Sequence, residues 1–196
     1  GDLYVGIMTV LGSIREIFML PINGIVNGAQ PVISFNYAAK KIDRCKKTLN
    51  TSILFGLVLM SLGTLCFNLI PEPMLRFFSS DEEVIRIGIT AFRIIGWSFL
   101  PLVTSLTYPV LFQAVGQPVK SSALTVIRTV ILFVPLGYLF SLIGLDYFWL
   151  TYPVTDGLTT LVGFLMCLFF FKKAYTQSSL EQAKAEHPVA IMPSRP

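Results

Sequence analysis

The sequence contains few charged residues. Asp, Glu, Lys and Arg make up 13% of its 196 residues, about half of the roughly 25% that is usual in a soluble domain. Hydrophobic residues make up 54%, and the mean hydropathy is +0.70. This composition excludes an ordinary soluble globular domain and predicts an integral membrane protein.

Residues that commonly carry catalysis or bind metals are also scarce. The single histidine, His187, lies close to the C-terminus, and the three cysteines, Cys45, Cys66 and Cys167, form no CxxC spacing. An odd number of widely separated cysteines argues against a disulfide framework or a metal site. With so few catalytic and ligand residues, we expect no enzymatic activity, no metal and no cofactor in this segment. The sequence also lacks a Walker A motif, so we expect no ATP hydrolysis.

The hydrophobic residues form five runs, each long enough to cross a bilayer, which takes about 20 residues. They predict an all-α polytopic membrane protein with five transmembrane helices in residues 1–173. The first run contains Pro21, which bends a helix, and Gly24 and Gly28, which allow a neighbouring helix to approach closely. A hairpin near Pro21 would instead give six shorter crossings. The expected spans are 3–37, 48–70, 84–115, 119–143 and 147–171.

Basic loops alternate with an acidic loop along the chain. Under the positive-inside rule the basic loops face the cytoplasm, and the acidic loop 71–83, in which Ser80 is a candidate helix N-cap, faces the outside. This distribution follows membrane topology and gives no indication of nucleic-acid binding. The polar, proline-containing segment 174–196 is expected to be a disordered cytoplasmic tail. The basic residues are Lys40, Lys41, Arg44, Lys46, Lys47, Lys120, Lys172 and Lys173.

Polar residues of the first run share one side of the predicted helix. At 100° per residue, five of them fall within roughly 60° of one another. A helix surrounded only by lipid has no reason to gather polar side chains in this way. The pattern therefore predicts one wall of a water-filled cavity, and the chain is expected to be part of a transporter. These five residues, called here the polar stripe, are Glu16, Asn23, Asn27, Gln30 and Ser34.

Glu16 and Asp156 are the acidic residues predicted to lie inside spans, where an ionisable group is costly and commonly lines a pathway or has a charged partner. Either could bind the driving cation or exchange a proton. The structural alternatives are an ion pair of Glu16 with the adjacent Arg15 or another cation, and an interhelical contact of a paired or protonated Asp156. Arg128 lies near the cytoplasmic end of its helix, and we expect its side chain to extend to the lipid phosphates.

The span 84–115 contains Pro101 and Pro109, which predict two kinks. Thr104, Ser105 and Tyr108 would line a binding pocket if the kinks turn them toward a lumen. In the alternative interpretation, the hydroxyl groups satisfy local backbone carbonyl groups.

Three segments resemble bacterial multidrug and toxic compound extrusion (MATE) transporters. The first runs from Leu20 to Arg44 and reads LPINGIVNGAQPVISFNYAAKKIDR. The second is FFSSDEEV at 77–84, and the third begins with AVGQP at 114 and continues through Arg128 to PLGY at 135–138. The resemblance is spread over about residues 1–173. One departure is Ala38, where the family usually has Gly.

This resemblance implies an antiporter of the bacterial cytoplasmic membrane that exports drugs and other amphiphilic, mostly cationic small molecules in exchange for H⁺ or Na⁺. MATE transporters have twelve helices in two six-helix lobes, and this chain resembles helices eight to twelve of the C-terminal lobe. Because the chain begins with Gly1 and shows no signal peptide, we expect the N-terminal lobe of the same protein to be missing from it. Family members that couple through the C-terminal lobe have acids in helices seven and ten. Helix ten here has none in its apolar core, so coupling is expected in the N-terminal lobe, with Glu16 or Asp156 as local alternatives.

Two other functions stay open. A lipid-linked saccharide flippase of the same superfamily would need more cationic residues in its cavity to bind pyrophosphate, and only Arg15 is predicted to lie deep in a span. A truncated product would be inactive alone, because half of a lobe pair cannot enclose an alternating-access site. The expected partners are the lipid bilayer and amphiphilic small molecules. The candidate pathway residues are Glu16, Asn23, Asn27, Gln30, Tyr108 and Asp156.

Overall fold

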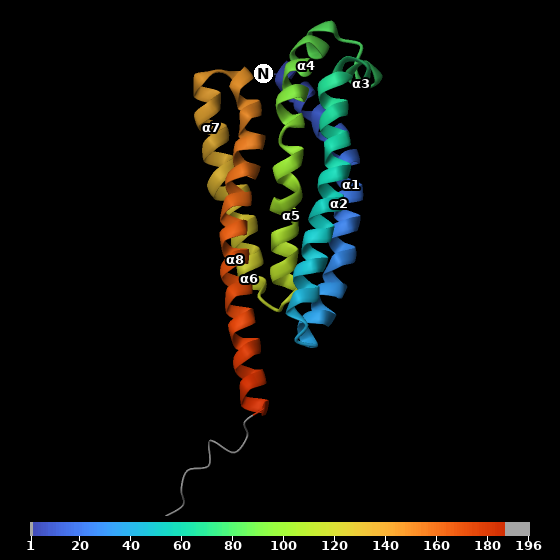
Figure 1. Cartoon of the computed structure of the whole chain (residues 1–196). Coiled ribbons are helices and arrows are strands. Elements are labelled where there is room, and N and C mark those ends of the chain that lie inside the picture. Colours follow the sequence, from blue (N-terminus) through green and yellow to red (C-terminus); the bar gives the residue numbers. More distant parts are fainter. Residues whose placement is uncertain (1, 187–196) are drawn as a thin grey trace, which may run out of the picture.

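The structure, a computed structural model, describes residues 2–186 and the side chains of residues 5–181. This part of the chain consists of helices joined by short turns (Figure 1). The helices α1 (Asp2–Ala38) and α2 (Ile42–Leu69) form an antiparallel pair, and α5 lies between α2 and α8. The remaining elements are α3 (Pro71–Phe78), α4 (Glu82–Gly96), α5 (Phe99–Ala114), α6 (Pro118–Val126), the π-helical η1 (Ile127–Phe133), α7 (Val134–Ile143), the 3-10 helix η2 (Leu145–Leu150) and α8 (Thr151–Glu186).

Four helical segments in residues 2–186 are long and apolar enough to cross a membrane. The helices α4 and α5, bent by 51° relative to each other, form a fifth if they are counted as one span. The predicted all-α membrane fold is thus confirmed. The hairpin alternative is wrong, because α1 continues through Pro21 as one helix.

The break between α4 and α5 lies at Trp97 and Ser98 and not at the two predicted kinks. Pro101 occupies the first turn of α5, where a backbone N–H has no partner within the helix in any case. The proline therefore marks the start of the second helix, and the bend falls just before it.

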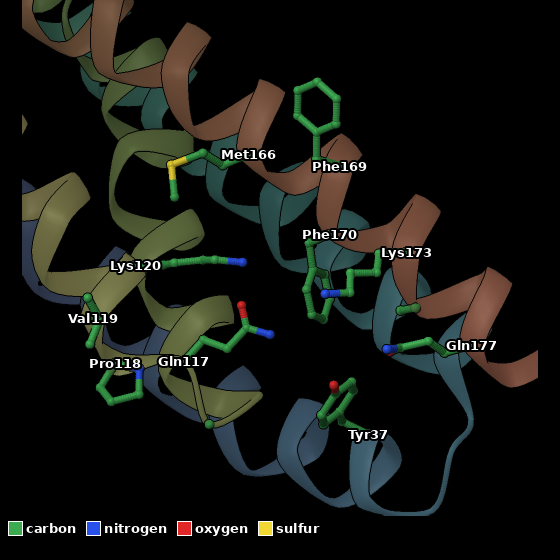
Figure 2. Close-up of a pocket in the computed structure, with 12 residues that line it drawn as sticks. Tyr37, Gln117, Pro118, Val119, Lys120, Met166, Phe169, Phe170, Lys173 and Gln177 are labelled. Carbon is green, nitrogen blue, oxygen red and sulfur yellow. The ribbon is translucent and has the colours of Figure 1, made fainter.

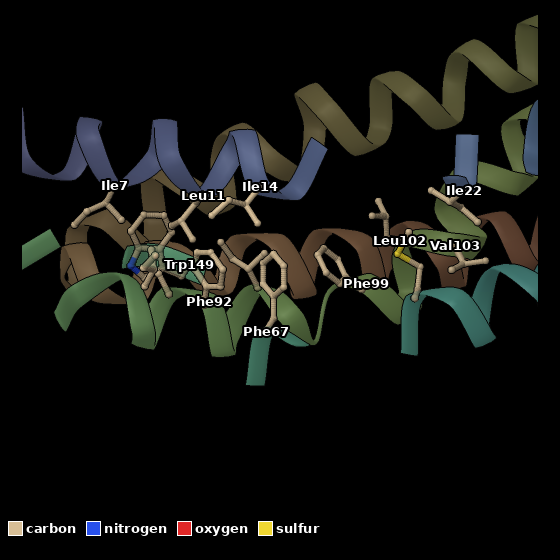
Figure 3. Close-up of a cluster of buried hydrophobic side chains, with 14 of the residues drawn as sticks. Ile7, Leu11, Ile14, Ile22, Phe67, Phe92, Phe99, Leu102, Val103 and Trp149 are labelled. Atoms are coloured by element: carbon tan, nitrogen blue, oxygen red, sulfur yellow. The ribbon is translucent and has the colours of Figure 1, made fainter. Parts of the chain in front are cut away.

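Large apolar side chains fill the core between α1, α2, α4 and α5. The ring of Phe67 lies at the centre of this cluster, with ring centroids 4.4 Å from Phe92, 4.7 Å from Phe99 and 5.3 Å from Phe18. The α1 members of the core recur every three to four residues, as expected for one face of a helix. Figure 3 shows this cluster, which includes Ile7, Leu11, Ile14, Ile22, Phe67, Phe92, Phe99, Leu102, Val103 and Trp149.

Glycine allows the closest approach between α5 and α8. A methyl group added at Gly163 would lie 2.5 Å from Cδ2 of Tyr108, so no larger residue fits without a shift. Gly24 and Gly28 differ from this. No atom lies within 4 Å of a methyl group added at either one, so the prediction that they admit a neighbouring helix is wrong for the part of the bundle that the structure describes.

The helical termini differ from two further predictions. Asp81, and not Ser80, caps α4, with its Oδ1 accepting hydrogen bonds from the backbone N–H groups of Glu83 at 2.9 Å and Val84 at 3.4 Å. The expected disorder from residue 174 is wrong as far as Glu186, because α8 continues to that residue. The sequence there lacks Gly and Pro and contains helix-forming Ala, Gln, Glu and Leu, which favours continuation. Residues 187–196 lie outside the described part of the chain.

A small ionic network connects α3 and α4 at the end of the bundle opposite to the C-terminal end of α8 (Figure 1). Arg76 of α3 donates hydrogen bonds to Glu82 at the start of α4 and to Glu72 of its own helix. The hydrogen bond to Glu82 is the main reason why the pKa of Arg76 is raised above its usual value. This network ties α3 to α4 at the acidic end, whereas the basic loop between α1 and α2 lies at the other end.

Candidate functional site

Asp156 lies in the second turn of α8 with 1% of its side chain exposed. Arg128 Nε donates a hydrogen bond of 2.8 Å to Oδ1 of Asp156, and Ser105 Oγ donates to the same oxygen at 3.3 Å. On the other side, Nη2 of Arg15 lies 3.7 Å from Oδ2 of Asp156. One carboxylate therefore joins α1, α5, η1 and α8, and it is the shared counter-ion of two arginines.

Arg128 is positioned by an irregular stretch of helix. It is the second residue of η1, and Pro135 lies two residues beyond the end of that segment. A proline removes one backbone donor and clashes with the preceding turn, and a π-helical turn is a common way to accommodate such an interruption. The expectation that Arg128 extends to the lipid phosphates is wrong, because its guanidinium points into the bundle and pairs with Asp156.

The three charged side chains line a pocket of about 260 Å³. The guanidinium carbon of Arg15 lies 5.0 Å from the ring centroid of Tyr152, which also lines the pocket, and the ring of Phe133 packs edge-on against Tyr152. Nε and Nη2 of Arg15 are buried and have no hydrogen-bond partner among the described residues. With two cations and one anion, the pocket is positive and retains free N–H donors.

The polar stripe lies on a different side of α1 from the residues that face the core. Glu16, Asn27 and Ser34 are exposed and Asn23 and Gln30 are half-buried, whereas the core-facing residues of the same helix, such as Ile22, Val26 and Ile33, are buried. Glu16 forms no ion pair with any described residue, and Arg15 contacts Asp156 instead of Glu16. The stripe therefore faces away from the interior of this lobe, and its role as a cavity wall stays a prediction.

Tyr108 is placed differently from its prediction. Its side chain is 6% exposed and belongs to the core between α5 and α8, where it packs on Gly163. The nearby hydroxyl groups satisfy backbone carbonyl groups, as the alternative interpretation proposed: Thr104 and Thr160 both donate to the carbonyl oxygen of Pro101 at 2.9 Å. Tyr108 is a packing residue in this structure, and its place in a transport pathway stays a prediction.

The model of the MatE family matches residues 1–139 of this chain. The chain belongs to the MATE family. Its members are transporters and not enzymes. A curated relative, the FAD transporter of Shewanella oneidensis, is 24% identical over 144 residues, which are 73% of this chain and 32% of that protein.

Solved structures of MATE proteins have the same fold. A crystal structure of a MATE transporter in the bent conformation superposes with a TM-score of 0.86 at 19% identity and is matched over 91% of this chain and 40% of its own length. The MATE multidrug transporter DinF-BH superposes with a TM-score of 0.75 at 28% identity, over 84% of this chain and 37% of its own length. This MATE chain thus spans less than half the length of the relatives that it matches.

Sequence reasoning identified Asp156 and Arg15 separately but missed the cluster that they form with Arg128. The available signal was that Arg15, Arg128 and Asp156 all lie within expected membrane spans, where unpaired charges are costly. Which of them meet depends on the order of the helices in space, and the spacing along the chain does not reveal that order.

Proposed function

We propose that this chain forms part of the C-terminal lobe of a cation-coupled MATE exporter of the bacterial cytoplasmic membrane, with its C-terminus in the cytoplasm. The exporter would move drugs and other amphiphilic, mostly cationic small molecules outward in exchange for H⁺ or Na⁺, together with an N-terminal lobe of the same protein. The observation that carries this proposal is the polar stripe. Its residues are exposed or half-buried on the lobe surface, and they include Glu16, which forms no ion pair with any described residue.

The two acids of this segment differ in their suitability for coupling. A coupling acid must exchange its proton or metal ion during each cycle, so it needs a vacant position beside its carboxylate. Asp156 is buried and already neutralised by Arg15 and Arg128, whereas Glu16 is exposed and forms no ion pair within the described part of the chain. We therefore place coupling in the N-terminal lobe, with Glu16 as the local alternative and Asp156 as a residue that holds helices together.

Efflux of a fluorescent cationic dye tests this proposal in cells that express the whole gene product containing this chain. We expect dye efflux that stops when the proton or sodium gradient is collapsed. Glu16→Gln should preserve efflux if coupling lies in the N-terminal lobe, and should abolish it if Glu16 is the coupling acid. Efflux that is insensitive to both gradients would contradict cation coupling.

Thiol reactivity tests whether the polar stripe faces water. In a background without native cysteines, Asn27→Cys should react quickly with a water-soluble maleimide. Val32→Cys, on the same helix and also exposed at 46%, should react slowly because its side faces lipid. Equal rates would show that the stripe borders lipid or another helix and not an aqueous cavity.

The positive pocket favours a second candidate function, the transport of anionic molecules. Arg15 offers two buried nitrogens that form no hydrogen bond with any described residue, beside Arg128 and the ring of Tyr152. Such a combination suits a phosphate or carboxylate attached to an aromatic group. The Shewanella relative is named as a transporter of FAD, whose pyrophosphate and rings have this chemistry. Arg15 and Arg128 also provide cationic residues of the kind that a lipid-linked saccharide flippase would need to bind pyrophosphate.

Uptake into everted membrane vesicles distinguishes the candidates. Gradient-driven uptake of tetraphenylphosphonium without uptake of FAD would support the cationic substrate class. Uptake of FAD that is lost in Arg15→Gln would support the anionic class.

A further inference from the structure

A groove of about 830 Å³ opens at the basic end of the bundle, separate from the Asp156 pocket. It lies between the end of α1, the start of α6 and the middle of α8 (Figure 2). Met166, Phe169 and Phe170 of α8 provide its apolar wall, and Lys120 of α6 and Lys173 of α8 provide two positive charges. The groove thus combines an apolar surface with a basic one.

The helical repeat places these α8 residues on one face. Positions 166, 170, 173 and 177 follow one another at intervals of three or four residues, and position 169 lies three residues after 166 and four before 173, so all five share one side of the helix. Lys172 is the direct neighbour of Lys173 but points about 100° away and does not line the groove. The two adjacent lysines therefore provide a natural comparison.

The two groove lysines lack a counter-ion. Neither Lys120 nor Lys173 forms an ion pair with any residue of the described part, and none of the groove-lining residues is acidic. The nearby acids have other partners, because Asp43 accepts a hydrogen bond from Tyr175 and Glu181 pairs with Lys40.

The ammonium groups extend toward the same space from opposite walls (Figure 2). Nζ of Lys120 lies 5.7 Å from the ring centroid of Phe112, whose negative face offers it some compensation. Two cations that share a cavity repel each other, and an anion between them would convert this repulsion into attraction. The groove is accordingly built to receive a negative group.

We propose that this groove binds an anionic phospholipid, with the phosphate between Lys120 and Lys173 and an acyl chain along Met166 and Phe169. Phe169 is 72% exposed, so an acyl chain would cover apolar surface that a soluble anion would leave bare. The groove also lies at the end of the bundle that contains the other basic loops, which anionic headgroups attract. The amide of Gln117 and the phenol of Tyr37, both in the lining, offer further donors to the headgroup. This site does not depend on which substrate the protein transports.

Lipid binding to the purified whole gene product tests the proposal. The protein would be placed in nanodiscs of phosphatidylcholine that contain increasing fractions of phosphatidylglycerol. Native mass spectrometry would then count the lipid molecules that stay bound to the protein after its release from the nanodisc. We expect phosphatidylglycerol to be retained preferentially. Lys120→Gln and Lys173→Gln should each weaken its binding about fivefold, and the double variant about 25-fold.

Lys172→Gln is the matched control, because it removes the same charge one residue away on the same helix. It should change phosphatidylglycerol binding by less than about twofold, and thermal unfolding should show that all variants remain folded. Equal retention of phosphatidylcholine, an unaffected double variant, or equal losses in Lys172→Gln and Lys173→Gln would each overturn the proposal. Complete displacement of the lipid by millimolar inorganic phosphate would also overturn it, because the lysines alone would then form a site for soluble anions.

Discussion

Asp156→Asn should destabilise this protein, and the structure indicates by how much. Asparagine keeps the size of the side chain and an oxygen that can accept from Arg128 and Ser105. It removes the carboxylate that forms ion pairs with both Arg15 and Arg128, however. Removal of one partner from a buried ion pair costs about 3–5 kcal/mol. Because the arginine side chains are 16% and 24% exposed, solvent screens part of this cost, and we expect about 2–3 kcal/mol.

A loss of this size should be visible as a lower melting temperature. A domain of 150–250 residues shifts by about 2–4 °C per kcal/mol, so the expected decrease is about 4–12 °C when this lobe of 196 residues unfolds as one unit. The assay is thermal unfolding of the whole gene product in detergent, followed by intrinsic fluorescence. Glu16→Gln is the control, because Glu16 is exposed and forms no ion pair with any described residue, so this change should shift the melting temperature by less than about 2 °C.

A second substitution distinguishes charge imbalance from a general packing defect. Asp156→Asn combined with Arg128→Gln returns the cluster to its original net charge, so the double variant should be more stable than Asp156→Asn alone. A double variant that is less stable than the single one, or an Asp156→Asn protein that melts like the wild type, would refute the idea that Asp156 is the shared counter-ion.

Two further predictions concern packing and orientation. Gly163→Ala should destabilise the folded protein by about 1–3 kcal/mol, because the added methyl group meets Tyr108. Gly157→Ala is the control and should not lower the melting temperature, because no atom lies within 4 Å of its added methyl group. Equal effects of the two changes would contradict the close contact. If the basic loop is cytoplasmic, Lys47→Cys in a background without native cysteines should resist an impermeant thiol reagent added to intact cells, and rapid external labelling would reverse the orientation. Lys47 is exposed, whereas Cys45 is fully buried and would resist labelling from either side.

The membrane-spanning helices were predictable from the sequence because each one must contain an apolar run of about 20 residues, enough to cross the bilayer. The ends of the helices were harder to predict, since they depend on local hydrogen bonds. The cap of α4 is an example. Ser80 and Asp81 are both good capping residues, and only the backbone geometry selects Asp81, whose carboxylate accepts from two N–H groups.

The predicted tail shows how composition can mislead. A change from apolar to polar residues after Lys173 marks the expected edge of the membrane, and it does not by itself end a helix. The chain remains helical to Glu186, and Tyr175 is anchored by its hydrogen bond of 2.7 Å to Asp43. Polar composition after Lys173 therefore did not justify the prediction of disorder, which is wrong as far as Glu186.

The candidate site was predictable in its parts but not in its arrangement. Arg15 and Glu16 are adjacent in the sequence, and an ion pair between them was one interpretation. Consecutive residues of a helix differ by about 100° in direction, so the two side chains point to different surroundings. Arg15 turns inward to Asp156 on α8, and Glu16 turns outward on the side of the polar stripe.

This arrangement connects the buried cluster to the exposed stripe. A rotation of α1 that moved Glu16 inward would separate Arg15 from Asp156 and bury a carboxylate without a partner, which is costly in a membrane. The contact between Arg15 and Asp156 therefore opposes rotation of α1 and keeps Glu16, Asn27 and the rest of the stripe directed outward. In this view Asp156 is a positioning residue. Its loss would reduce transport by disturbing the orientation of α1.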